Sequence, residues 1–163
     1  MYSIGDKISH PMHGAGIIED IVSERVGGEV RQYYVMRLTY GSMTVMIPAA
    51  SFGSIGVRRI ISAEEADKLV TGFSAIQIED NQNWNKRYRE NMLKIKSGDL
   101  YQVAQVVKSL VVRDKERGLS TGERKLLSSS RQILISELML AKEVSSEEIE
   151  HIINRSLIGM DSE

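Results

Sequence analysis

Residues that could support metal chemistry are scarce in this chain of 163 residues. Its three histidines are His10, His13 and His151, and it contains no cysteine. A zinc site takes about four ligands, or three with one open position, and no acidic residue stands beside His10 and His13 at ligand spacing. The absence of cysteine also excludes disulfides and thiolate chemistry. We therefore expect no bound metal, and interpret the segment around His10 and His13 as a turn between strands.

Motifs for nucleophilic or phosphate chemistry are incomplete. Gly14–Gly16 lacks the third glycine and the following helix that let a glycine-rich loop bind phosphate, so it is typical of a bend in a strand. Ser128–Ser130 lies in a helical pattern with no histidine nearby in the sequence. No carboxylate stands isolated on an apolar face where burial would tune its pKa. The sequence thus predicts a protein that is not an enzyme, with no cofactor and no small-molecule substrate.

The charge of the chain is unevenly distributed. The formal net charge is −1, but residues 84–131 hold twelve Lys/Arg against five Asp/Glu, a net of +7. The remainder holds nine basic and seventeen acidic residues, a net of −8. Such a basic segment can attract polyanions even when the whole chain is nearly neutral. The alternative is the ordinary solvated surface of a charged helix.

The basic segment begins with the most informative stretch, Asn83–Lys96, which reads NWNKRYRENMLKIK. At helical spacing Trp84, Tyr88, Met92 and Ile95 fall on one stripe, with basic residues on its flanks. One interpretation is a core stripe with a solvated basic back. The other is a grip on an opened duplex, in which cations bind phosphates and a first-turn indole stacks on, or wedges beside, an unstacked base. The residue pattern leaves both interpretations open.

The pattern of residues 1–61 predicts short strands. Five stretches are rich in β-branched and aromatic residues: Lys7–Ser9, Gly16–Ile18 with Asp20–Val22, Gln32–Leu38, Met43–Ile47 and Val57–Ile61. Gly27-Gly28 and Gly41-Ser42 supply the positive φ angles of tight turns, and Pro48 ends the fourth strand. Five short strands with close turns favour a small β-barrel or a strongly bent sheet.

From Ser62 onward the apolar residues recur with the period of helices. Three capping boxes, each a serine followed three residues later by a glutamate, predict helix starts: Ser62–Glu65, Ser120–Glu123 and Ser145–Glu148. Asp99 is a plausible cap for a further helix that ends near Gly118. We therefore predict an α+β fold with a domain boundary near residue 61, so that a β domain of residues 1–61 precedes an all-α domain of residues 62–163.

The chain carries no membrane signal. Its N-terminus lacks the apolar core of a signal peptide, and no apolar run is long enough to span a bilayer. We expect a soluble, cytoplasmic protein with no membrane partner, acting as a monomer.

Several motifs, taken together and in order, resemble the CarD family of bacterial transcription regulators. In the C-terminal half these are Asn83-Trp84-x-Lys86-Arg87-Tyr88, Ser97-Gly98-Asp99, Val106-Val107 and Arg113-Asp114-x-Glu116-Arg117-Gly118-Leu119-Ser120-x-Gly122-Glu123-Arg124. In the N-terminal half they are Pro11-x-His13-Gly14-x-Gly16 and Thr44-Val45-x-Ile47-Pro48. The match covers nearly the whole chain, which is far more specific than any single motif.

The resemblance implies a Tudor-like N-terminal barrel that binds the β subunit of RNA polymerase, and a helical domain that contacts promoter DNA. Trp84 matches the family's tryptophan wedge, which enters the minor groove at the upstream edge of the transcription bubble and stabilises the open complex. Basic residues that match the family's DNA-backbone contacts are Lys86, Arg87 and Arg89, with a second pair at Arg124 and Lys125. The resemblance thus places the protein on the nucleoid through RNA polymerase.

The polymerase-facing positions match the family less well. Glu24 and Met46 stand where basic residues are expected, although the adjacent Arg25 could substitute. We take Glu24, Arg25, Val26 and Met46 as the candidate polymerase contacts. The alternative function is a protein–protein adaptor with no direct DNA contact, in which Trp84 would belong to the core.

Overall fold

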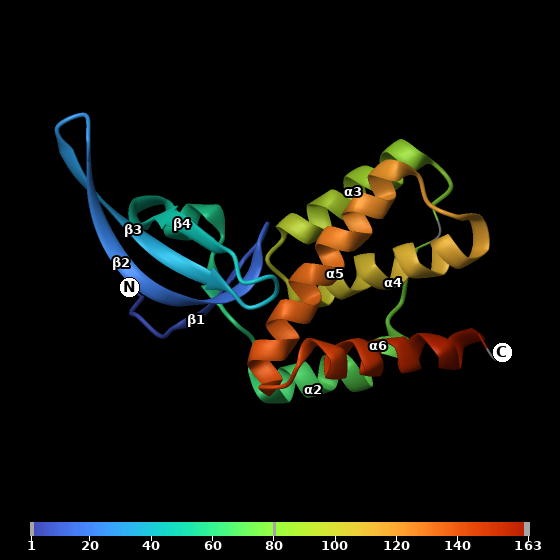
Figure 1. Ribbon diagram of the computed structural model, residues 1–163. Helices are drawn as coiled ribbons and strands as arrows, with labels where there is room; N and C mark the ends of the chain where they lie inside the picture. Colours follow the sequence, from blue (N-terminus) through green and yellow to red (C-terminus); the bar gives the residue numbers. More distant parts are fainter. Residues whose placement is uncertain (1, 80, 162–163) are drawn as a thin grey trace.

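The computed structural model describes residues 2–79 and 81–161, in which a sheet is followed by a helical bundle (Figure 1). The five strands of the sheet are β1 (Lys7–His10), β2 (Gly14–Val26), β3 (Glu29–Leu38), β4 (Thr44–Pro48) and β5 (Arg58–Arg59). Every pairing is antiparallel, in the order β4-β3-β2-β1-β5. The prediction of an α+β chain with the strands first is therefore confirmed.

The turns of the sheet follow the glycine pattern. Gly27 and Gly28 have φ angles of 60° and 87° and join β2 to β3, and Gly41 and Ser42 have φ angles of 96° and 58° between β3 and β4. β2 and β3 pair as far as Val26 opposite Glu29, well beyond the residues that β1 and β4 cover. The hairpin therefore projects from the sheet as a free ribbon (Figure 1).

The prediction of a closed barrel is wrong. Among the described residues β4 and β5 are the two opposite edges of the sheet and do not pair with each other. After Pro48 the chain forms the helical turns η1 (Ala49–Ser51) and α1 (Phe52–Ile55), and β5 then returns beside β1. β5 is also shorter than the predicted strand Val57–Ile61. The N–H of Ile61 donates to the carboxylate of Glu137 instead of to a neighbouring strand, so the chain has left the sheet by this residue. A two-residue strand at the far edge cannot close a barrel.

The described residues of the helical half form four longer helices, one shorter helix and a 3-10 turn: α2 (Ala63–Thr71), η2 (Phe73–Ala75), α3 (Trp84–Lys96), α4 (Leu100–Arg117), α5 (Thr121–Lys142) and α6 (Ser146–Asp161). The serines of all three predicted capping boxes accept hydrogen bonds from the expected N–H groups. Asp99 caps α4, which ends at Gly118 as predicted. Within the described part of the chain, no helix combines the length and the apolar character needed to cross a bilayer.

Each half has its own apolar core. The first, around Ile8, Ile18 and Met36, lies on the sheet. The second is formed by residues of α2 to α6 and includes the fully buried Leu134. Helix α5 packs against α4 and α6 and also contacts β2. It therefore forms the main contact between the two halves.

Candidate nucleic-acid interface

Trp84 is the first residue of α3 and its side chain is half exposed, at 42%. Its ring stacks on Tyr88 with centroids 5.0 Å apart and an interplanar angle of 15°. Its indole Nε1 donates to Ser120 Oγ over 3.1 Å. The ring is thus held on one face and at one edge while much of its surface remains open to a ligand.

The stripe predicted along α3 changes character along its length. Ile95 is buried in the helical core, whereas Tyr88 and Met92 are partly buried against it. Trp84 lies at the exposed end. The core interpretation therefore holds for the C-terminal part of the stripe, and the first turn of α3 leaves the core.

The bond from Trp84 to Ser120 brings two helix N-termini together, because Ser120 caps α5. The first turn of α3 contains no acidic residue. A helix N-terminus carries partial positive charge, so Lys or Arg there opposes the dipole instead of complementing it. Lys86, Arg124 and Lys125 nevertheless lie in the early turns of these two helices and are exposed. The first turn of α5 contains Glu123, but its carboxylate is paired with Arg87. The exposed cations and the two helix N-termini therefore leave positive charge near Trp84 that suits an anionic ligand.

Arg87 does not share this exposed surface. Its side chain is 7% exposed and its guanidinium forms two hydrogen bonds to Glu123, from Nε over 2.8 Å and from Nη2 over 3.1 Å. Nη1 donates to the carbonyl of Asn81 over 2.9 Å. We expected Arg87 to contact a DNA phosphate. In this structure its guanidinium instead donates to protein acceptors, Glu123 and the carbonyl of Asn81. Arg87 instead ties the start of α3 to α5.

Glu123 is the functional partner that the sequence pattern did not reveal. Burial would raise the pKa of Glu123, but the hydrogen bond and charge of Arg87, the charge of Arg113 and the hydrogen bond at Ser120 together hold it below its ordinary value. The capping-box spacing predicted that Ser120 would bind the N–H of Glu123. It gave no sign that the Glu123 carboxylate would face Arg87 from another helix.

The remaining candidate DNA contacts are exposed. Lys86 has a side-chain exposure of 66%, and its Nζ lies 4.0 Å from Oε1 of Glu90, one turn further along α3. Arg89 is exposed on the same helix. The structure therefore brings Trp84, Lys86, Arg124 and Lys125 to the paired ends of α3 and α5, with Arg89 one turn along α3.

The candidate polymerase contacts occupy two separate places on the sheet. Glu24, Arg25 and Val26 lie at the free end of the β2–β3 hairpin, where Glu24 is opposite Arg31. Met46 lies on the edge strand β4, opposite Val35, and is 47% exposed. Arg31 and Val35 are four residues apart on β3, or about 13 Å at strand rise. The two places could belong to one interface only if it runs along the hairpin.

The two N-terminal histidines lie side by side with ring centroids 4.5 Å apart. Burial and the neighbouring His13 lower the pKa of His10 to about 4, and its Nδ1 accepts the N–H of Met12. Among residues 2–79 and 81–161, no three His, Cys, Asp or Glu side chains are grouped as a metal site requires. His10 is therefore neutral near pH 7, and its hydrogen bond from Met12 stabilises the β1–β2 turn.

Two family models match the chain, one over each half. The model described as CarD-like/TRCF RID domain matches residues 2–61, and that of the CarD C-terminal domain matches residues 68–154. A protein of Bacillus subtilis (strain 168) named "Putative transcription factor YdeB" is 37% identical over 149 residues. That similarity covers 91% of this chain and 97% of the relative. Both halves therefore have relatives in the same order.

The Arg87–Glu123 pair predicts a pH-dependent stability. Arg87→Met leaves a buried, unpaired carboxylate and should cost about 3–5 kcal/mol at pH 7, whereas Lys86→Met should change stability by about 0.5 kcal/mol or less. Because the pKa of Glu123 is lowered in the native protein, its ionised form stabilises the fold at pH values above its unfolded pKa of about 4.3. This contribution to the free energy of unfolding is lost as the pH falls through the folded pKa. The difference between native protein and Arg87→Met should therefore shrink in acid.

Urea unfolding at pH 7 and at pH 3.5 measures this difference. A deficit in Arg87→Met that stays the same at both pH values would show that the charge pair is not its source.

Proposed function

The chain belongs to the CarD family, as its motifs predicted, and on that premise we propose that it stabilises the open promoter complex by binding both RNA polymerase and DNA. Family membership supports a role in transcription regulation through interaction with RNA polymerase. We assign the β subunit to residues 1–61 and the upstream edge of the bubble to residues 62–163. The protein would act by binding and not by catalysis.

The single observation that carries the DNA part is the half-exposed Trp84 at the paired N-termini of α3 and α5. A ring that is already held by Tyr88 and Ser120 loses little freedom when it meets a base. Partial unstacking of a base step by an inserted side chain costs a few kcal/mol in closed duplex, but little at a fork that is already open. Trp84 would therefore bind the open fork more tightly than the closed promoter, which shifts the equilibrium toward the open form.

The exposed cations would hold the DNA backbone. Lys86, Arg89, Arg124 and Lys125 surround or follow the wedge, and each phosphate that they neutralise releases counterions. Arg87 would act as a positioning residue, because its guanidinium already binds Glu123. Contacts of this kind carry no base information, so promoter preference would depend on how easily the sequence opens.

The polymerase would bind along the free edge of the sheet. Among the described residues β4 pairs with β3 alone, so the backbone groups on its outer side could pair with a strand of the partner. Met46 and the hairpin residues Glu24, Arg25 and Val26 would supply side-chain contacts. Since Met46 is apolar, this part of the interface should depend less on salt than an ionic contact would.

We expect Trp84→Ala to shorten the lifetime of open complexes by about tenfold, because stacking of one ring contributes about 1–3 kcal/mol. Leu93→Ala is the matched control, since Leu93 is 65% exposed on the same helix. Decay of promoter complexes after heparin challenge measures the lifetime, and thermal unfolding checks the fold. If Trp84→Ala lowers the melting temperature by many degrees and loses polymerase binding as well, Trp84 is a core residue and the wedge is wrong.

Charge reversal by Lys86→Glu and Arg89→Glu should weaken binding to a fork-junction duplex about equally for different sequences. Loss of two phosphate contacts should reduce the slope of log affinity against log salt by about 2. Lys68→Glu on α2 is the control, because Lys68 is exposed and its Nζ lies 3.7 Å from Oε1 of Glu64, one turn earlier on the same helix. An absent salt dependence in the native protein would favour the adaptor function, and a loss restricted to one promoter would mean that these residues read bases.

Met46→Glu should weaken the binding of the full chain to isolated polymerase β subunit, because a carboxylate would be buried against the partner. Met12→Glu is the control, since Met12 is 52% exposed in the β1–β2 turn, away from β4. Pull-down at two salt concentrations measures the effect. Unchanged binding removes Met46 from the interface, and no binding by the native chain refutes the assignment of the β subunit.

A further inference from the structure

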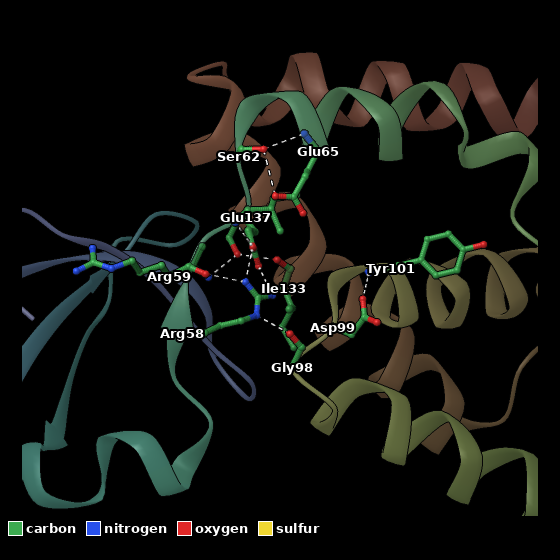
Figure 2. Close-up of polar contacts among 12 residues, drawn as sticks. Arg58, Arg59, Ser62, Glu65, Gly98, Asp99, Tyr101, Ile133 and Glu137 are labelled. Carbon is green, nitrogen blue, oxygen red and sulfur yellow. Dashed lines mark hydrogen bonds and ion pairs between the residues drawn. The ribbon is translucent and has the colours of Figure 1, made fainter. Parts of the chain in front are cut away.

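The strongest feature outside the proposed contacts is an ion pair between the two halves. Arg58 of β5 reaches α5 and binds Glu137 with two hydrogen bonds, from Nη1 over 2.7 Å and from Nη2 over 2.9 Å (Figure 2). The Glu137 side chain is 0% exposed and that of Arg58 is 30% exposed. A buried carboxylate is tolerated only when it is paired and hydrogen-bonded, so this contact restricts where α5 can lie.

Further bonds give this contact a fixed direction. Arg58 Nε donates to the carbonyl of Gly98, in the turn between α3 and α4, and the N–H of Ile61 donates to Glu137 over 2.9 Å. The neighbouring Ser136 accepts the N–H of Ala15 on β2 over 2.8 Å. One guanidinium therefore connects β5, α5 and the α3–α4 turn, and the residue of α5 just before Glu137 binds the sheet independently.

The packing beside this contact is equally close. A side chain at Gly14 would meet Ser136 Oγ at 2.5 Å and Ile133 Cα at 3.2 Å. Gly14 also has a φ angle of 87°, which disfavours any other residue. The sheet thus approaches the backbone of α5 as near as a glycine allows, and the two halves have little room to slide.

Helix α5 also holds the wedge, at its other end. There Ser120 binds Trp84, and Glu123 binds Arg87. Glu123 lies 14 residues before Glu137, or about 21 Å along a helix. A tilt of about 10° at Glu137 would displace the Trp84 end by about 4 Å, which exceeds one base step of about 3.4 Å. Small changes at the contact with the sheet would therefore move Trp84 out of reach of the fork.

We propose that the Arg58–Glu137 ion pair is a positioning device that sets the direction of α5, and with it the place of Trp84, relative to the polymerase-binding sheet. This inference rests on the proposed function. Arg58 and Glu137 touch neither DNA nor polymerase in this scheme. They determine whether both surfaces can be occupied at the same time, so their loss should affect the joint complex and spare each separate binding step.

The test uses the absence of cysteine, which allows two spin labels to be introduced at chosen sites. Gln32 on β3 and Ser129 on α5 are both exposed and belong to different halves. Pulsed electron paramagnetic resonance then measures the distribution of distances between the halves in the free protein. The key variant is Arg58→Met with Glu137→Met, because an apolar replacement of a buried pair usually retains stability while it removes directional bonds. Arg59→Met, at an adjacent residue that is 63% exposed, is the matched control.

We expect the double variant to broaden the distance distribution at least about twofold and to shorten the open-complex lifetime at least about fivefold, the lower end of measured couplings between sites. Its separate affinities for β subunit and for fork-junction DNA should stay within about twofold of the native values, and Arg59→Met should match the native protein throughout. Arg58→Lys keeps the positive charge but not the two parallel hydrogen bonds of a guanidinium. It should give a distance distribution and an open-complex lifetime between those of the native protein and the double variant.

A broad distance distribution in the native protein overturns the proposal. So does a distribution in the double variant that is as narrow as the native one. So does a broadened distribution with an unchanged lifetime. If the double variant does not fold, Arg58→Lys decides, and a native-like distribution in that variant overturns the proposal. Failure of the proposed function is distinguishable, because it would appear as a native lifetime in Trp84→Ala while the distances in the free protein still report on the ion pair.

Discussion

The arrangement of this molecule depends on two buried carboxylates of one helix. Glu123 and Glu137 are both 2% exposed or less on α5, and a carboxylate removed from water must find a cation. Arg87 meets the first from a position 36 residues away, and Arg58 meets the second from 79 residues away. Each pair recruits a different element, α3 in one case and β5 in the other. Helix α5 thereby becomes the common reference for the aromatic end of α3 and for the sheet.

This arrangement bears on how a small protein could act on a large complex. Two binding surfaces on one rigid body make the second contact intramolecular, so that its effective concentration is set by geometry. Under the proposed function, a few exposed cations and one ring would need to bind DNA only weakly once the sheet was bound to polymerase. The gain falls if the halves reorient freely, and it is lost if their geometry prevents both contacts at once. For that reason the contact between α5 and the sheet would matter as much as the contacting residues themselves.

Local features of the fold could be predicted from the sequence, and non-local ones could not. The turn at Gly27-Gly28 and the caps at Ser62 and Ser120 depend on residues within a few positions of one another. The open sheet depends on which edge β5 joins, a choice that no local pattern contains. In the candidate site, Arg87 carries the same charge as Lys86 and Arg89 and lies in the same stretch of the sequence. Only the approach of Glu123 from another helix separates the buried arginine from the exposed cations.

The two interpretations of Trp84 that the sequence left open are less opposed than they first look. A ring that pushes between bases needs support from behind, since a freely rotating side chain would yield to the stacked duplex and lose entropy on ordering. Tyr88 and Ser120 provide such support, and they do so from positions adjoining the helical core. Arg87 and Glu123 fasten the same turn of α3 one residue layer deeper. A wedge must therefore be partly a core residue, and the 42% exposure of Trp84, at the end of a stripe that becomes buried at Ile95, would suit the proposed role.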